Sequence, residues 1–515
     1  MIDKPLSPEP VVKLVKYFPE PFKNVIATAK TCYSSKGIVK DEDIELEKYI
    51  DLAKSIYEAG HHTTYQHAHF QFAIENVSRQ FIWSFLHSHP FYNSEQVSQR
   101  YVEVKPGNYF IPPLNGKALE IYISTIEFQN ETYKKLTEIL FPVVESEYYK
   151  RFPARKFYQE KYKKDIKRKA QEIARYVLPI ATFAYLYHTV SAVTILRYYK
   201  LCNQFDVPLE QKIVVKKLVD EILKVDPNYK IILEEPIDEK DIIEFNFAQN
   251  IHQANFSKEF TKEFDESLNG KISLLIDYKP NAEKILASSV REIFGLPSNA
   301  LSDDEAINLV LNPSINKILA ESLVLTTHSK LSRAMFHVSY TFKKKLSHTA
   351  DSQDQRHRMV PASRPILSCQ IYDEPDFITP ALISQSDLAL KIYIQTMEKI
   401  WENIAKLMKI GVSPEFALYL LPNAVSIRFT ESGDLLNLHH KYAMRLCYNA
   451  QEEIWRASFE EVQQISEIHP RIAKFLLPPC SIRDLANVKP TCPEGPRFCG
   501  VKVWKLKLSE YSRLI

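Results

Sequence analysis

Alternating hydrophobic and polar residues mark short strands at two distant places in the chain. Residues 12–19 alternate in this way and end in a Tyr-x-Pro turn, and a helical run through Ile26-Ala27 follows. Residues 272–280 repeat the plan, with the same Tyr-x-Pro ending and a helical run through Leu286-Ala287. A period of two places apolar side chains on one face, which predicts half-buried strands.

The parallel between the two stretches continues downstream. Each half contains a second alternating strand that leads into a helical segment. A Leu-Pro pair follows in each half. It precedes a long helical region that ends in a helix with a glutamine. The matching landmarks are residues 70–74 with 336–342, Leu178-Pro179 with Leu421-Pro422, and Gln211 with Gln451. Two stretches built on one plan predict a duplicated α+β unit, with an antiparallel sheet flanked by helices in each copy.

The domain boundaries follow from this repeat. At 515 residues the chain is too long for a single ordinary core. An acidic, irregular stretch begins at residue 234 and indicates a connector that runs to about residue 265. We therefore predict an N-terminal unit over 1–233, a connector over 234–265 and a C-terminal unit over 266–515.

Residues Tyr176 to Leu196 contain no Asp, Glu, Lys or Arg. A run of this length raises the possibility of a membrane span. Pro179, His188 and several hydroxyl-bearing residues make it a poor one. We expect instead the entry of a buried helix pair, and no membrane contact.

Composition narrows the class of protein. Hydrophobic residues at 45% and charged residues at 25% are globular values, and a net charge of +3 gives no whole-protein field for nucleic acid. Seven scattered cysteines fit a reducing cytoplasm, and the N-terminus shows no secretory signal. Cys480, Cys492 and Cys499 lack zinc-ribbon spacing, which indicates structural thiols. No Gly-x-Gly-x-x-Gly occurs, so a phosphate has to be held by side chains or helix ends.

Arg356-His357-Arg358 is the most informative short motif. Three adjacent side chains that are cationic or can become so repel one another, and arginine's planar fork binds phosphate or a carbonyl edge in two places. The motif predicts an anionic ligand, such as a nucleotide. A solvated basic turn is the alternative, because Pro361 and Pro365 follow closely.

Two other clusters carry weaker signals. Residues 150–169 are rich in Lys and Arg with aromatic residues between them, a pattern that could bind nucleic acid through side chains such as Lys163, Lys164, Lys167 and Arg168. A solvated helix face is the commoner meaning, and we expect that one. His61, His62, His67 and His69 lack a carboxylate or cysteine in register, so we predict no metal there.

These landmarks together resemble the flavin-dependent thymidylate synthase family, whose signature contains the Arg-His-Arg motif. In the first half the matching stretches are Ala29–Ser34, His61–His67, Ser78-Arg79, Ser98–Tyr101 and Ala174–Pro179. In the second half they are Gln353–Arg358, Gly411–Glu415 and Ala450–Ile454. The resemblance implies reductive methylation of dUMP to dTMP. Methylenetetrahydrofolate gives the carbon, FAD relays it and supplies hydride, and NADPH reduces the flavin.

Each half departs from the family pattern in a different place. Where the second half has its arginines, the first half has His87-Ser88-His89 or, with no insertion before Ser98, Ser88-His89-Pro90. It keeps the residues that the resemblance assigns to phosphate and sugar, namely Gln96, Ser98, Arg100 and Arg175. The second half keeps Gln353, Arg356 and Arg445 for the nucleotide and its uracil ring, but has Ile366, Ser368 and Leu418 in the phosphate positions. Arg79 is expected to be a structural ion-pair partner.

This complementary loss predicts one composite nucleotide site between the halves, with Arg356 and Arg445 as its catalytic residues. The related site, which has Cys202 in place of Arg445, should be inactive. Two chains in a homodimer would then imitate a four-unit assembly with two working sites.

The flavin assignment is weaker than the nucleotide assignment. The resemblance assigns flavin contacts to His61, Thr63, Arg356, His357 and Arg358. Gln66 replaces the usual glutamate, however, and the family's Asn-x-Arg motif is absent, with Ser191 and Val193, or Asp434 and Leu436, in its place. FAD could bind weakly, differently or not at all. A catalytically inactive nucleotide-binding or scaffolding homologue is therefore the alternative.

Overall fold

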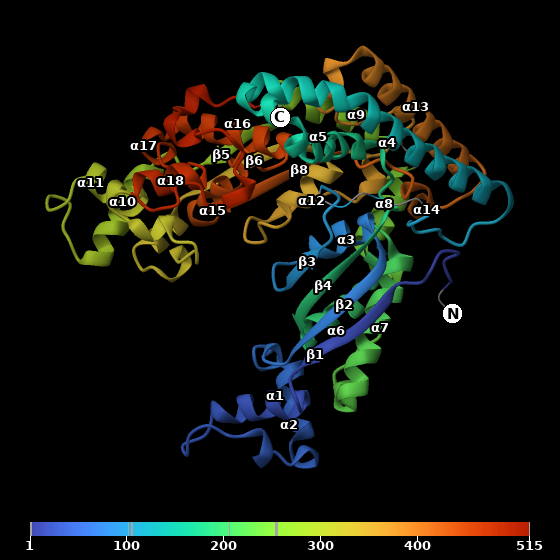
Figure 1. Ribbon diagram of the computed structural model, residues 1–515. Helices are drawn as coiled ribbons and strands as arrows, with labels where there is room; N and C mark the ends of the chain where they lie inside the picture. The colour runs from blue at the N-terminus through green and yellow to red at the C-terminus, as the bar shows by residue number, and fades with distance from the viewer. Residues whose placement is uncertain are drawn as a thin grey trace.

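The computed structural model describes the chain except for residues 1–2, 101, 103, 105–106, 205, 253–255 and 514, so the end of the Ser98–Tyr101 motif and part of the connector lie outside the described residues. Two four-stranded antiparallel sheets form its frame (Figure 1). The first contains β1 (Val11–Tyr17), β2 (His69–Ser78), β3 (Asn93–Gln96) and β4 (Phe183–Ser191). The second contains β5 (Ser273–Tyr278), β6 (Ser339–Ser347), β7 (Ala362–Ser363) and β8 (Ser426–Asp434).

The two sheets share one topology, which confirms the duplicated α+β unit. Their strand orders are β1-β2-β4-β3 and β5-β6-β8-β7. The register of the β1–β2 pair shifts between Leu14 and Lys16, and that of the β5–β6 pair shifts at the matching point, between Leu275 and Asp277. The first sheet has a further irregularity between Ile74 and Val77, where the second is continuous.

Helices surround both sheets, and a pair of long ones crosses the junction between the halves. The first half contains α1 (Pro21–Thr31), α2 (Leu46–Glu58), α3 (Arg79–Leu86), α4 (Gly116–Arg151), α5 (Gln159–Ala174), α6 (Ala192–Lys200) and α7 (Pro208–Val225). The second contains α10 (Ala282–Phe294), α11 (Asp303–Leu311), α12 (His348–Asp354), α13 (Asp387–Lys409), α14 (Pro414–Leu418), α15 (Leu435–Arg445), α16 (Glu452–Ile468), α17 (Pro470–Ala473) and α18 (Pro479–Leu485). Helices α4 and α13 pack side by side at the upper right of Figure 1.

The charge-free segment from Tyr176 to Leu196 is not a helix pair, and that prediction was wrong. It contains the junction between the halves and then β4, which pairs with β2 on one side and β3 on the other. The corresponding segment of the second half, after Leu421-Pro422, likewise enters a strand, β8, before its helices begin. A central strand and a buried helix both exclude charge, so composition alone did not separate them. Among the described residues, no helix has the length and apolarity needed to cross a membrane.

The connector is more ordered than its acidic sequence predicted. It contains α8 (Ile243–His252) and α9 (Ser257–Ser267). Asp265, on α9, accepts hydrogen bonds from Nε and Nη2 of Arg428 at 2.8 and 2.8 Å and from Nζ of Lys345 at 2.7 Å. Its carboxylate thus compensates two cations of the second sheet, which holds the helix against that sheet.

The halves are joined by backbone hydrogen bonds related by an approximate twofold axis. Ile180 donates to the carbonyl of Leu421 at 2.8 Å, and Asn423 donates to the carbonyl of Leu178 at 2.8 Å. Gln129 of α4 adds a side-chain link, because its amide donates to the carbonyls of Val177 and Leu420 at 3.0 and 3.1 Å. Each Leu-Pro landmark of the sequence therefore lies in this junction.

Two buried glutamates complete the junction. Glu210 accepts hydrogen bonds from the backbone and hydroxyl of Ser78, both at 2.6 Å, and from the Tyr419 hydroxyl at 2.7 Å. Glu453 does the same for Ser347 of its own half and for Tyr176 of the first half, at 2.6, 2.6 and 2.5 Å. Both serines also cap the helix that follows, α3 or α12. Each carboxyl thus joins a strand-helix turn of its own half to a tyrosine of the other half.

We expect Glu210→Gln to reduce the pH dependence of stability. Burial raises the pKa of Glu210 from its ordinary 4.5 to about 7, against three opposing hydrogen bonds. The folded state therefore holds a proton more tightly than the unfolded state, so this stability is complete below about pH 4.5 and is lost as pH rises through about 7. The difference corresponds to about 3 kcal/mol. Thermal unfolding at a series of pH values measures it.

The matched control is Glu259→Gln, because Glu259 is exposed on α9. It should keep the wild-type dependence of Tm on pH. Identical profiles for wild type, E210Q and E259Q would show that Glu210 does not titrate in this range.

Candidate functional site

The Arg-His-Arg motif follows α12 and faces the edge strand β3 of the other half. Arg356 forms an ion pair with Glu95, with 2.6 Å between Nη2 and Oε1. Arg358 donates to the carbonyl of Pro90 and to Oδ1 of Asn93, both at 3.2 Å. A cleft of about 290 Å³ lies between the halves here. Its lining includes Gln71, Tyr92, Gln96, Tyr187, Thr189, Arg356 and Arg358.

His357 differs from its two neighbours because it is a neutral group. Its backbone N–H donates to the carbonyl of Asp354 at 2.9 Å, which turns the residue inward at the end of α12. Burial first, and the Arg445 cation next, hold the pKa of His357 well below its ordinary value. The expected set of three mutually repelling cations is therefore two cations flanking a neutral imidazole. This arrangement removes part of the repulsion that the sequence alone suggests.

Arg445 lies at the end of α15, beside the other predicted ring-side groups. Its Nη2 donates to the carbonyl of Gln353, and the Gln353 side chain donates to Gln451. Gln451 in turn donates to the Tyr176 hydroxyl, which binds Glu453 of the junction. A continuous hydrogen-bond network thus ties the position of Arg445 to the contact between the halves.

The electrostatics of Arg445 place it near cations from both halves. Burial lowers the pKa of Arg445 to about 10; Asp354 opposes this shift, and Arg356 and Arg100 add to it. Arg100 belongs to the first half, and its Nη2 donates to the carbonyl of Asn449, four residues after Arg445, at 2.7 Å. Arg445 therefore lies within electrostatic range of one guanidinium group from each half, which favours an anionic ligand nearby.

The predicted phosphate-side arginines surround one buried carboxylate. Arg100 donates through Nε to Glu172 at 2.7 Å, and Lys169 donates to the same carboxylate at 3.0 Å. Arg175 is 4% exposed, and its Nη2 has no hydrogen-bond partner among the described residues. Burial alone would raise the pKa of Glu172, but Arg100, Lys169 and Arg175 hold it well below its usual range. The cations outnumber the carboxylate, so the pocket retains capacity for a further anion.

Arg79 has a different role from the one expected. It donates to Oε1 of Gln96 at 3.0 Å and to the carbonyl of Val97 at 2.7 Å, so it fixes the end of β3, and it forms no ion pair with a residue that the structure describes. Burial, and then Arg175, lower the pKa of Arg79 to about 9. The Ser78-Arg79 pair marked this arginine in the sequence. The sequence did not show which groups the Arg79 side chain would bind. Ser98 completes this corner, since its hydroxyl accepts from the Arg100 backbone at 3.3 Å.

The structure brings most of the predicted site together and leaves two residues outside it. Gln96 and Arg356 line the inter-half cleft, and Arg445 contacts Gln353. Arg100 reaches the Asn449 carbonyl after α15, with Ser98 and Arg175 close to Arg100. His61 and Thr63 are exposed in the loop between α2 and β2. Among the described residues, neither lines the cleft of Arg356 and Arg358.

The related position on the other side of the axis is closed by the protein itself. By the strand registers, Asp206 takes the place of Asn449, and it accepts from the backbone of Leu367 at 2.7 Å. Arg364 is paired with the buried Asp351, with 2.8 Å between Nη2 and Oδ1, and Trp83 donates to Asp351 at 2.8 Å. An acidic group and an already neutralised arginine make this position unfavourable for an anion.

The basic stretch over residues 150–169 contains both solvent-exposed and inward-pointing lysines. Lys163 and Lys164 are exposed on α5. Lys169, near the other end of the same helix, is turned inward to Glu172. The exposed lysines agree with the expectation that this stretch forms a solvated helix face. That the protein does not bind nucleic acid stays a prediction.

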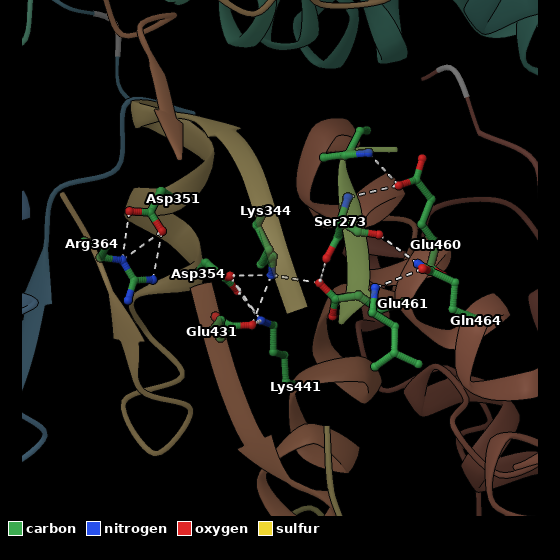
Figure 2. A network of polar contacts seen from close by, with 12 residues as sticks. Ser273, Lys344, Asp351, Asp354, Arg364, Glu431, Lys441, Glu460, Glu461 and Gln464 are labelled. Carbon is green, nitrogen blue, oxygen red and sulfur yellow. Dashed lines mark hydrogen bonds and ion pairs between the residues drawn. The ribbon is translucent and has the colours of Figure 1, made fainter. Parts of the chain in front are cut away.

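A buried cluster of five charged side chains includes Asp354, two residues before the Arg-His-Arg motif (Figure 2). Lys344 contacts Asp354, Glu431 and Glu461 at 3.0, 3.1 and 2.8 Å. Lys441 contacts Asp354 at 3.1 Å and also Glu431. Asp354 ends α12, just before the motif, so the cluster anchors the segment that presents Arg356.

The first half has no such cluster at the matching positions. The strand registers align Lys344 with Ile74 and Glu431 with His188. His188 packs against Phe85 with ring centroids 5.0 Å apart. The charged core therefore belongs to the half that carries the arginine motif.

Lys344→Met should destabilise the protein strongly. It leaves three buried carboxylates with one ammonium group, and breaking a buried ion pair costs about 3–5 kcal/mol. Chemical denaturation measures the change. Lys343→Met is the control, because Lys343 is on the opposite face of β6 and donates to Ser267 at 2.7 Å. It should cost less than about 1 kcal/mol. Equal losses for the two variants would contradict the anchoring role of the cluster.

Comparison with known proteins supports the repeat. Two segments, residues 13–228 and 274–471, match the family model of the thymidylate synthase complementing protein. A flavin-dependent thymidylate synthase from Clostridium tetani (strain Massachusetts / E88) is 30% identical over 221 residues, which cover 42% of this chain and 84% of that protein. One from Geobacter sulfurreducens is 25% identical over 247 residues, covering 47% and 97%. Each relative therefore corresponds to about half of this chain.

Among solved structures, a UMP/dUMP methylase, PolB from Streptomyces cacaoi bound with 5-Br dUMP, aligns with a TM-score of 0.32 and 18% identity. The alignment covers 43% of this chain and 94% of that chain.

Proposed function

Because this chain belongs to the thymidylate synthase complementing protein family, we propose that it is a flavin-dependent thymidylate synthase with one composite dUMP site between its two halves. The product is dTMP. The observation that carries the proposal is the position of Arg445, which lies within electrostatic range of Arg100 from the first half and of Arg356 from the second. Neither half alone supplies this set of cations.

The phosphate of dUMP is held by the first half. Arg100 and Arg175 offer charge-assisted hydrogen bonds, and the unpartnered Nη2 of Arg175 is available without breaking a contact. Ser98 lies beside Arg100, and Gln96 lines the inter-half cleft; both bind the phosphate and sugar. Arg79 holds Gln96 in place through its 3.0 Å hydrogen bond.

The uracil ring is held by the second half. During methylation the ring attacks an electrophilic methylene through C5, and negative charge develops on the ring oxygens. Arg356 and Arg445 stabilise that charge, and Gln353 fixes the direction of Arg445 through its carbonyl. Arg356 has to exchange its ion pair with the exposed Glu95 for the substrate.

A bound flavin supplies the carbon relay and the hydride, with methylenetetrahydrofolate as carbon donor and NADPH as reductant. The described residues of one chain do not complete a flavin site, because His61 and Thr63 lie away from the cleft of Arg356 and Arg358. We propose that a second copy of the chain brings these two residues to the cleft. A homodimer of this kind has two working sites.

The alternative is a nucleotide-binding homologue without catalytic activity. It is favoured by the residues in place of the Asn-x-Arg motif, which have structural roles. Ser191 hydrogen-bonds Thr194 at 2.9 Å, Asp434 caps α15, and Val193 and Leu436 are buried. The purified protein distinguishes the two functions. The enzyme should be yellow, with a flavin absorbance band, and should oxidise NADPH only when dUMP is present; a colourless protein without this activity would establish the alternative.

Single substitutions on each side of the site test the division of labour. Arg100→Ala and Arg356→Ala should each lower dTMP formation by at least about 100-fold. Arg100→Ala removes a charged donor to the phosphate, and Arg356→Ala removes a charged donor to the negative charge that develops on the uracil ring. Ser88→Ala and Ser368→Ala are the controls, since these residues occupy the related, closed position. Both controls should stay close to wild type in a steady-state assay. Similar losses at all four positions would contradict a single composite site.

A further inference from the structure

A cavity of about 750 Å³ lies between the end of α4, helix α5 and the segment that follows α18. Its walls come from the stretches 147–155, 165–172, 448–449 and 494–515, together with Arg100. Small-molecule sites in proteins commonly have volumes of about 300–1,000 Å³. The stretch 494–515 lies beyond residue 471, where the family match ends. One wall of the cavity is therefore built from a part of the chain that the family match does not cover.

Cationic side chains outnumber acidic ones around this cavity, and each acidic side chain is already paired. The pairs are Glu147 with Lys150 at 3.5 Å, Asp165 with Arg168 at 3.6 Å, Glu494 with Arg497 at 3.5 Å, and Glu172 with Arg100 at 2.7 Å and with Lys169 at 3.0 Å. Arg151, Arg155 and Arg513 remain, and none of them forms an ion pair with an acidic side chain that the structure describes. The cavity therefore carries an excess of positive charge.

Arg513 is a buried cation with an unused donor. It lines the cavity and is 8% exposed, and its Nη1 has no hydrogen-bond partner among the described residues. Its Nε donates to the main-chain oxygen of Ile515 at 3.1 Å, and the excess of positive charge persists even when that oxygen is counted as a negative group. Burial lowers the pKa of Arg513 to about 10; Glu172 opposes this shift, and Arg100 adds to it. A buried charged donor without an acceptor is costly, and an anion in the cavity would remove that cost.

Arg155 is held at the cavity wall by groups that do not neutralise it. Its Nη1 donates to the Tyr148 hydroxyl at 2.6 Å, and its guanidinium lies 4.2 Å from the centroid of the Phe152 ring. Gly500 packs against the same group, because a Cβ at this position, where φ is +90°, would collide with the guanidinium and with the Phe152 ring. The surrounding chain thus fixes the direction of a cation and leaves its charge available to a ligand.

We propose that this cavity binds an anion with several phosphate groups, such as a nucleoside triphosphate or inorganic polyphosphate, through Arg151, Arg155 and Arg513. A guanidinium group can bind phosphate oxygens in two places. Three such groups around one cavity favour a ligand with several phosphates over one with a single carboxylate. The volume suits a small molecule, and the exposed lysines of α5, Lys163 and Lys164, do not line the cavity, which disfavours a nucleic-acid strand along this helix.

This site is separate from the composite dUMP site, although the two share a wall. Arg175, Arg356 and Arg445 are not among the described residues that line the cavity. Arg100 does line it, and donates through Nη2 to the Asn449 carbonyl at 2.7 Å. The proposal rests on the arginines of α4, of the turn after it and of the stretch 494–515, and it does not depend on the methylation activity.

Isothermal titration calorimetry of the full-length protein with sodium tripolyphosphate tests the site. The wild type should bind about one tripolyphosphate per chain, and the affinity should fall as the salt concentration rises. Arg513→Gln should weaken binding at least about tenfold, because it removes a buried charged donor. Arg151→Ala should weaken it about threefold. Arg151 is exposed at the end of α4, so this variant keeps the test valid if Arg513→Gln fails to fold.

Lys164→Ala is the matched control, because it removes one positive charge from an exposed position of α5 outside the cavity. It should bind tripolyphosphate as the wild type does. A wild type that does not bind, or equal affinity of the wild type, R151A and R513Q, would overturn the proposal. A single-stranded RNA oligonucleotide that displaces tripolyphosphate at a lower concentration than ATP does would also overturn it, in favour of a nucleic acid.

ATP separates the two sources of the phosphate groups. Tighter binding of ATP than of tripolyphosphate identifies a nucleotide as the ligand, and weaker binding identifies inorganic polyphosphate. dUMP, titrated separately, reports on the proposed function. Its affinity should be the same for the wild type and R151A, and a wild type that binds tripolyphosphate but not dUMP would contradict the proposed function alone.

Discussion

The contact between the two halves is the constraint on which the rest of the structure depends. Glu210 and Glu453 are buried at this contact, and each accepts hydrogen bonds from a serine of its own half and a tyrosine of the other. A buried carboxyl that lost these donors would be left without solvation, which is costly. The halves therefore meet in one register, and that register brings β3 of the first half to the Arg-His-Arg motif of the second.

The same backbone plan supports two different interiors. The second half places Lys344 and Lys441 among three carboxylates beneath its arginine motif, whereas the first half has Ile74 and the His188–Phe85 pair at matching places. Buried charges are tolerated only when they are paired, and they fix geometry more narrowly than apolar packing does. We infer that the charged core was retained, or acquired, in the half that has to hold two arginines in place.

The position across the approximate twofold axis differs in charge from its counterpart. Asp206 stands where Asn449 stands in the second half, and the Arg364 guanidinium is neutralised by Asp351. A carboxylate repels an anionic ligand directly, and a paired arginine has little to offer it. Conversely, Nη2 of Arg175 has no hydrogen-bond partner among the residues that the structure describes.

The sequence by itself determined the repeat and the strands around it, because alternation and motif order are local properties that each copy preserves. It did not distinguish β4 from a buried helix, since both exclude charge. Only the tertiary structure decided that Arg79 binds Gln96, that the pKa of His357 is lowered between its two arginine neighbours, and that His61 and Thr63 lie outside the cleft. These outcomes depend on distances between segments far apart in the chain, and such distances are set by the packing of the two halves rather than by any local pattern.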